Sequence, residues 1–363
     1  MTSEGLEGGI PPPASSASNV ETMPELRKDP ITREWVIVAT ERAKRPSDFH
    51  HKEEATLVQT QDHSNCPFCP GHESATPPEI LAYRPPGYIA NTNGWSVRVI
   101  PNKFSALNQL GEPLLRKDGI YESMPGVGAH EVIIETPEHG KSLARLNVKQ
   151  VEQVLLAYRD RYLSLRQDPW LKYILIFRNH GKVAGASIEH AHSQLVATPI
   201  IPQLAWLKIK GIERYQEYYR RCVYCDIIEQ ESNEGKRIVA MNGSFLSFAP
   251  YASRYPFEMW IMPKQREAHF VNISPAQTGE LAAILKETLL RLDLCLDDPP
   301  YNYTLLTTDF TDNFHWHIEI VPRLSIAAGF ELGTGIYINI VAPEQAASYL
   351  RRIDIERQDD ERL

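Results

Sequence analysis

The sequence predicts an α+β fold with a mainly antiparallel sheet, and two observations support this prediction. Segments typical of strands and of helices follow one another without the regular strand–helix alternation of parallel folds. The same order of parts also occurs twice: a Cys-x-x-Cys pair, a strand, a helix, a strand and a His-x-His pair. We therefore expect an internal duplication, with two units that share one sheet or lie face to face.

The first unit is expected at residues 23–205. Its helix has Asn147 as a plausible N-cap, followed by apolar side chains at i, i+3 and i+4 spacing from Val148 to Leu165. Short runs of apolar and β-branched residues predict the strands of this unit at 34–39, 131–135, 172–178 and 190–194.

The second unit is expected at residues 206–350. Its helix begins with Ser274 as N-cap, Pro275 at the first position and Gln277 at the third, which together form a strong start signal. Cys295 lies in the apolar part of this helix, where we expect a buried thiol. Strands are predicted at 257–262, 301–308 and 315–319.

Composition narrows the class of protein. Of the 363 residues, 42% are hydrophobic and 23% charged, as in ordinary soluble globular proteins. No apolar run approaches the roughly 20 residues of a membrane span, so we expect a cytoplasmic protein without a membrane partner. The net charge of -8 argues against nucleic-acid binding.

Residues 1–22 are rich in Gly, Pro and Ser and are expected to be a disordered tail, with a second tail at 351–363.

Four of the five cysteines form two Cys-x-x-Cys pairs, Cys66 with Cys69 and Cys222 with Cys225. In a cytoplasmic chain such pairs indicate metal or redox sites before disulfides. Because each pair is followed by histidines in the same order, we favour metal over dithiol chemistry. Tetrahedral zinc bound by four Cys or His ligands leaves no open position, so both sites would be structural.

The remaining ligands of the first site should be histidines of the same unit. The candidates are His130, His139 and His190. We favour His139 together with His190, because the bend at 136–137 that precedes His139 has a counterpart at 262–263 in the second unit.

The second site departs from this pattern. His315 is the counterpart of His190, but the residue at the position that matches His139 is Arg266. A guanidinium group cannot coordinate zinc. We expect His269, three residues later, to replace it, with His317 as a weaker alternative; otherwise the site is three-coordinate or empty.

Within the last strand of the first unit, His190, His192 and Gln194 alternate with small residues and would project from one face. Such a face suits a metal pair or a nucleophilic histidine. If His190 binds zinc, His192 is free to attack phosphorus and form a phosphoramidate. Neutral donors from Gln194, from the Ser187 hydroxyl and from backbone amides near Gly185 could hold the phosphoryl oxygens.

The second unit has Glu319 where the first has Gln194. A carboxylate repels a phosphate anion at short range. We therefore expect catalysis in the first unit only.

These residues resemble a known family. The series Asn179, Ser187 and His190-Ala191-His192-Ser193-Gln194 resembles the galactose-1-phosphate uridylyltransferases of the histidine-triad superfamily. Further matching motifs, in the same order along the chain, are Arg42-Ala43-Lys44-Arg45-Pro46, the first Cys-x-x-Cys pair, Pro101-Asn102, Thr136-Pro137-Glu138-His139 and Gly329-Phe330-Glu331.

The resemblance implies two histidine-triad-like units and a ping-pong reaction through a nucleotidyl group on His192, stabilised by Gln194. It implies a nucleotide-sugar donor, a phosphate or sugar phosphate acceptor, and a tendency to form homodimers. The zinc ligands of the family correspond to Cys66, Cys69, His139 and His190. Residues expected to bind substrate, besides the catalytic Ser187, are Arg42, Arg45, Asn102, Asn179, Gly185, Phe330 and Glu331.

Departures from the family pattern keep two reactions open. Ala191 and Ser193 replace Pro and Gly beside the nucleophile, and Ser325 and Phe330 replace a lysine and a tyrosine near the hexose phosphate. The family default is uridylyl transfer from UDP-glucose to a hexose 1-phosphate. The alternative is the ADP-glucose phosphorylase branch, which moves AMP from ADP-glucose to inorganic phosphate. More distant alternatives are a zinc-dependent phosphate-ester hydrolase and a zinc module without catalysis.

Overall fold

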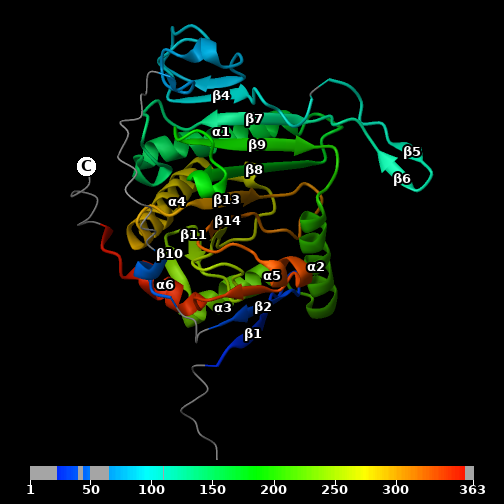
Figure 1. Ribbon diagram of the computed structural model, residues 1–363, viewed down its shortest axis with the longest axis vertical. Coiled ribbons are helices and arrows are strands. Elements are labelled where there is room, and N and C mark those ends of the chain that lie inside the picture. The colour runs from blue at the N-terminus through cyan, green and yellow to red at the C-terminus, as the bar shows by residue number, and fades with distance from the viewer. Residues whose placement is uncertain (1–22, 40–43, 50–64, 109, 356–363) are drawn as a thin grey trace, which may run out of the picture.

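A large sheet with helices packed against it forms the centre of the molecule (Figure 1). The computed structural model describes residues 23–39, 44–49, 65–108 and 110–355. The predicted tail at 1–22, Arg42 and the end of the chain from residue 356 lie outside the described residues. The predicted α+β class is confirmed. Among the helices of the described ranges, none is both long and apolar enough to cross a membrane.

The elements have the following bounds. The strands are β1 (Glu25–Lys28), β2 (Trp35–Val38), β3 (Leu81–Tyr83), β4 (Val97–Pro101), β5 (Arg116–Asp118), β6 (Tyr121–Ser123), β7 (Ala129–Ile134), β8 (Tyr173–His180), β9 (His192–Thr198), β10 (Ile238–Met241), β11 (Phe245–Phe248), β12 (Met259–Pro263), β13 (Tyr301–Leu306), β14 (His317–Pro322) and β15 (Tyr337–Asn339). The α-helices are α1 (Val148–Leu165), α2 (Gln203–Tyr219), α3 (Val223–Glu234), α4 (Pro275–Leu296), α5 (Gly329–Thr334) and α6 (Pro343–Arg351).

The large sheet has ten antiparallel strands in the order β10-β11-β12-β14-β13-β8-β9-β7-β4-β3. This order is symmetrical about the central pair of β8 and β13. Outward from that pair, β9, β7, β4 and β3 follow on one side, and β14, β12, β11 and β10 follow in matching sequence order on the other. The symmetry supports the expected duplication, with the two units sharing one sheet.

Helices α1 and α4 cover one face of this sheet and pack against each other (Figure 1). Both begin where the sequence predicts. The Asn147 side chain accepts a hydrogen bond from the Gln150 backbone amide at 2.8 Å, and Ser274 and Gln277 form a capping box at the start of α4. Cys295 is buried in α4, as expected, and the main apolar core lies between the two helices and the sheet.

The opposite face of the sheet carries two smaller apolar clusters, one in each half. The cluster of the first half contains Phe68, Trp95 and Val132, and that of the second contains Tyr224 and Trp260. In the antiparallel ladder Val132 is paired with Gln194, so both side chains lie on this face. The candidate functional groups therefore project away from α1 and α4.

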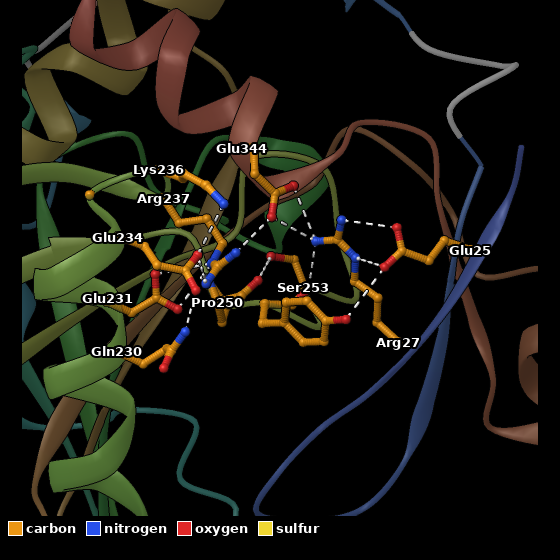
Figure 2. A network of polar contacts seen from close by, with 12 residues as sticks. Glu25, Arg27, Gln230, Glu231, Glu234, Lys236, Arg237, Pro250, Ser253 and Glu344 are labelled. Carbon is orange, nitrogen blue, oxygen red and sulfur yellow. Dashed lines mark hydrogen bonds and ion pairs between the residues drawn. The ribbon is translucent and has the colours of Figure 1, made fainter. Parts of the chain in front are cut away.

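The N-terminal strands do not join the ten-stranded sheet. β2 pairs with β1 and, in parallel, with β15, which belongs to the expected second unit. Figure 2 shows the ion pairs that hold this arrangement: Arg27 of β1 bonds Glu344 of α6 at 2.9 Å, and Arg237 bonds both Glu344 at 2.8 Å and Glu231 of α3 at 3.0 Å. Residues 23–39 thus pack against the second half of the chain.

A buried polar network joins the two halves beside β9. Arg178 of β8 pairs with Glu135 at 3.0 Å and donates to the Tyr301 hydroxyl of β13 at 2.8 Å. Tyr158 of α1 donates to the Ser193 hydroxyl of β9 at 2.7 Å. The Arg178 and Glu135 side chains are at most 2% exposed, so neither charge has water as an alternative partner.

We predict that Arg178→Met lowers the free energy of unfolding by about 3 to 5 kcal/mol, because it leaves the Glu135 carboxylate buried without its cation. The double variant Arg178→Met/Glu135→Leu should recover most of this loss. Urea unfolding followed by circular dichroism measures both. Lys117→Ala, which breaks the exposed Lys117–Glu122 pair, serves as control and should change stability by less than about 1 kcal/mol. A double variant no more stable than Arg178→Met would show that the loss does not come from an unpaired buried carboxylate.

Candidate active site and metal centres

His192 begins β9 and is almost fully buried against the ring of Phe68, with ring centroids 5.3 Å apart. Its Nδ1 lies 2.9 Å from the carbonyl oxygen of His190, which can only accept, so Nδ1 carries the proton. Burial lowers the pKa of His192 and favours the neutral ring. The unprotonated Nε2 then holds the lone pair that a nucleophile needs.

Gln194 shares the face of His192, two residues further along β9. Its Oε1 lies 2.8 Å from Nε2 of His130 on β7 and 3.4 Å from Nδ2 of Asn102, which follows β4. Lys103, Ser105 and His130 are among the residues that line an open hollow of about 610 Å³ beside these side chains.

The loop between β8 and β9 lies beside Asn179. Asn302 of β13 donates from its Nδ2 to Asn179 Oδ1 and to the Ala184 carbonyl oxygen, both at 2.8 Å. Because the Asn179 oxygen is engaged, its amide hydrogens are the groups available to a ligand. Gly185 has a φ of +93°, which a side chain would strain. Asn302, which sequence reasoning did not single out, brings a residue of the second half to this site.

Cys66, Cys69, His139 and His190 form one cluster in which the four ligand atoms lie within 4.8 Å of one another. The Cys69 sulfur lies 3.2 Å from His139 Nδ1 and 3.6 Å from His190 Nδ1, and the Cys66 sulfur lies 3.7 Å from His190 Nδ1. Sulfur and nitrogen ligands of one tetrahedral zinc are about 3.6 Å apart. The residues therefore fit a zinc ion.

The orientation of the His190 ring also agrees with a metal ligand. His190 Nε2 lies 2.7 Å from the Thr136 carbonyl oxygen, which places the proton there and leaves Nδ1 to face the cysteines. Burial and the neighbouring Cys66 thiol raise the pKa of Cys69 to about 11. A bound metal is what lets two adjacent thiols ionise together.

His190 is not part of the predicted strand. β9 begins at His192, so only His192 and Gln194 share its face, whereas His190 turns toward the cysteines from the preceding loop. A strand would have placed all three side chains together. The backbone bends at residue 190, where the ring contacts the two cysteines on one side and the Thr136 carbonyl oxygen on the other.

The second cluster contains Cys222, Cys225 and the fully buried His315. The expected fourth ligand, His269, is not among them, and this prediction is wrong. His269 Nδ1 lies 2.9 Å from the Thr308 carbonyl oxygen and its Nε2 lies 3.3 Å from Asp312, so both ring nitrogens face oxygen atoms instead.

Arg266, at the position that matches His139, donates to the Asp312 carbonyl oxygen at 2.8 Å and to Asn313 Oδ1 at 2.6 Å. Its charge opposes the rise in the pKa of Cys225, which burial and the Cys222 thiol nevertheless raise to about 11. The described residues of this cluster thus offer three ligands.

The second histidine pair repeats the hydrogen bonds of the first. His315 Nε2 lies 2.7 Å from the Pro263 carbonyl oxygen, and His317 Nδ1 lies 2.8 Å from that of His315. Here, however, Nε2 of His317 lies 3.4 Å from Glu319, which also pairs with Lys208. Although burial opposes ionisation, Lys208 and His317 hold the pKa of Glu319 far below its usual value. A carboxylate therefore occupies the place of the Gln194 amide.

The other predicted substrate residues are placed as follows. Ser187 is exposed in the β8–β9 loop. Arg45 is exposed, and its backbone amide donates to Asp48. Phe330 and Glu331 lie on α5, which packs against β15, and Glu331 caps the start of that helix. No described contact joins these four to His192, and their roles in binding stay predictions.

The fold and the site together define a known family. Residues 15–202 match the family described as "Galactose-1-phosphate uridyl transferase, N-terminal domain", and residues 142–362 match a domain of unknown function, DUF4921. The chain belongs to the galactose-1-phosphate uridylyltransferase family, and the resemblance found in its sequence is confirmed.

Individual relatives cover nearly the whole chain. An ADP-glucose phosphorylase of Arabidopsis thaliana is 37% identical over 340 residues, which are 92% of this chain and 93% of the relative. A galactose-1-phosphate uridylyltransferase of Thermotoga maritima is 31% identical over 92% of this chain and the whole of the relative. The relatives thus include both an ADP-glucose phosphorylase and a galactose-1-phosphate uridylyltransferase.

A solved structure of an ADP-glucose phosphorylase from Arabidopsis thaliana with bound ADP-glucose is 35% identical, with a TM-score of 0.76 over 91% of this chain and 99% of that one. A uridylyltransferase structure is 28% identical, with a TM-score of 0.69 over 90% and 97% of the two chains.

We predict that the two metal clusters differ in their affinity for zinc, because only the first has four ligands among its described residues. Arg266→His should increase the zinc that the protein retains during dialysis against a chelator. The matched exchange His139→Arg should decrease it. Elemental analysis of the dialysed proteins measures both, and retention that neither substitution alters would contradict the assignment.

Proposed function

We propose that this protein transfers a nucleotidyl group from a nucleotide-sugar to a phosphate acceptor by two displacements at Nε2 of His192. The observation that carries the proposal is the contact between His192 Nδ1 and the His190 carbonyl oxygen, which leaves the Nε2 lone pair on the face that carries Gln194. Membership of the uridylyltransferase family supports the same chemistry.

In the first step, His192 Nε2 attacks the α-phosphorus of the nucleotide-sugar, and the bond from that phosphorus to the bridging oxygen breaks. The sugar 1-phosphate leaves with the electron pair. The ring gains positive charge while Nδ1 keeps its proton, and the His190 carbonyl oxygen stabilises that charge.

In the second step, an oxygen of the acceptor phosphate attacks the same phosphorus. The bond between phosphorus and Nε2 breaks, and the lone pair returns to the ring. The amide of Gln194, the amide of Asn179, the hydroxyl of Ser187 and backbone N–H groups near Gly185 would hold the non-bridging oxygens in both steps. All are neutral donors, so none has to lose a proton.

Zinc in the first cluster would be held by Cys66, Cys69, His139 and His190. Its contribution would be to fix the loop that presents His192, since all four of its coordination positions are taken by protein. A zinc ion with four protein ligands and no place for His192 argues against the hydrolase alternative, in which His190 and His192 would bind a catalytic metal together. A zinc ion held by Cys222, Cys225 and His315 would act similarly in the second half.

For the donor and acceptor we favour ADP-glucose and inorganic phosphate. The 37% identical relative is named an ADP-glucose phosphorylase, and a similar structure holds ADP-glucose. Ser325 also stands where uridylyltransferases have a lysine near the hexose phosphate, and serine offers no charge to a sugar phosphate.

The second candidate is uridylyl transfer from UDP-glucose to a hexose 1-phosphate in galactose metabolism, as in the 31% identical relative. A homodimer and a cytoplasmic location stay predictions from the sequence.

We predict that incubation with ADP-glucose labelled at the α-phosphorus, without acceptor, leaves acid-labile label on the protein, and that added phosphate removes it. UDP-glucose should label less. His192→Asn should not label, because asparagine can still donate to the His190 carbonyl oxygen but has no counterpart of Nε2. Label is measured on the denatured, filtered protein.

The matched control is His317→Asn, the same exchange in the second unit, which should label like the parent. Labelling of His192→Asn, or no labelling of the parent by either donor, would refute the mechanism. Stronger labelling by UDP-glucose, with removal by galactose 1-phosphate rather than by phosphate, would instead select the second candidate reaction.

A further inference from the structure

We infer that His130 is a positioning residue that fixes the orientation of the Gln194 side-chain amide. The inference rests on the proposed function, in which the Gln194 NH2 group binds a phosphoryl oxygen. His130 lies on β7, directly beside β9, and its side chain is on the same face as His192 and Gln194.

The hydrogen bonds of His130 define which of its nitrogens carries the proton. The backbone N–H of Ala106 donates to His130 Nδ1 at 3.3 Å, so Nδ1 must be unprotonated. In a neutral imidazole the proton then resides on Nε2. Nε2 lies 2.8 Å from Gln194 Oε1, and it donates to that oxygen.

Asn102 supports the same orientation. Its Oδ1 accepts from the Phe104 backbone N–H at 2.9 Å, so its Nδ2 is the atom that faces Gln194 Oε1 at 3.4 Å. Asn102 Nδ2 also lies 3.0 Å from His130 Nε2. With the proton on His130 Nε2, the Asn102 amide donates to Gln194 Oε1 and not to the ring. The opposite tautomer, in which His130 Nε2 accepts from Asn102 Nδ2, is the outcome that the nitrogen-15 measurement below would reveal, and it would overturn the inference.

The orientation of Gln194 matters because an amide has one accepting and one donating end. With Oε1 held by His130 and Asn102, only the NH2 group is available for a phosphoryl oxygen, which can only accept. If the amide were reversed, two donors would face the NH2 group, and Oε1 would repel the phosphoryl oxygens. His130 thus acts on the reaction through Gln194, without touching the reacting atoms.

The test is single-turnover formation of the nucleotidyl enzyme from ADP-glucose in His130→Phe and His130→Gln. Phenylalanine fills the space of the ring but lacks the donor, whereas glutamine can place an N–H near the position of Nε2. We expect His130→Phe to slow formation on the order of 10-fold or more, with the donor KM little changed, and His130→Gln to recover most of the rate.

A second measurement separates positioning from a general structural effect. In a Gln194→Ala background, His130→Phe should cause no further loss, because the residue it orients is gone. His269→Phe, which replaces another histidine bonded through both nitrogens, is the control and should keep the rate of the parent. An equal loss in the Gln194→Ala background, or no loss in His130→Phe, overturns the inference.

The tautomer offers a readout independent of activity. Nitrogen-15 NMR of histidine-labelled protein should show His130 neutral with its proton on Nε2, and a proton on Nδ1 would overturn the inference. If the parent forms no nucleotidyl enzyme at all, the proposed function fails, and the inference fails with it. If the parent forms the nucleotidyl enzyme and the His130 variants form it at the same rate, the inference alone fails.

Discussion

The site depends on the way the backbone at His190 is held. One nitrogen of the His190 ring faces Cys66 and Cys69, and the other lies 2.7 Å from the Thr136 carbonyl oxygen. The carbonyl oxygen of the same residue accepts from His192 Nδ1. The cluster of Cys66, Cys69, His139 and His190 therefore fixes the group that sets the tautomer of His192. In the proposed mechanism, this structural element is a condition for nucleophilic attack.

The two halves of the chain share this scaffold and differ in charge. His315 and His317 repeat the backbone hydrogen bonds of His190 and His192 almost atom for atom. The second half, however, has a carboxylate at Glu319 and a guanidinium at Arg266 where the first has a neutral amide and a metal ligand. A carboxylate repels a phosphate at short range, and a guanidinium cannot coordinate a metal. The proposed function therefore assigns catalysis to the first half only.

Local signals in the sequence predicted the repeated order of elements, the starts of α1 and α4 and the grouping of Cys66, Cys69, His139 and His190. They failed where position depends on distant contacts. The sequence could not place residues 23–39 beside β15, because that pairing joins strands near opposite ends of the chain and leaves no local signal. His269 was assigned by spacing alone, but the turn after β12 directs its ring to Thr308. His130 and Asn302 belong to no sequence motif that indicates their position. The register of their strands with β9 and β8 brings them to the site.

The mechanism turns on which ring nitrogen of His192 carries the nucleotide. The nucleotidyl enzyme, formed without acceptor on protein labelled with nitrogen-15 histidine, can be examined by phosphorus and nitrogen NMR for the coupling between the two nuclei. We predict a bond to Nε2 of His192, because Nδ1 is committed to the His190 carbonyl oxygen. A bond to Nδ1, or a bond to any other residue, would contradict it.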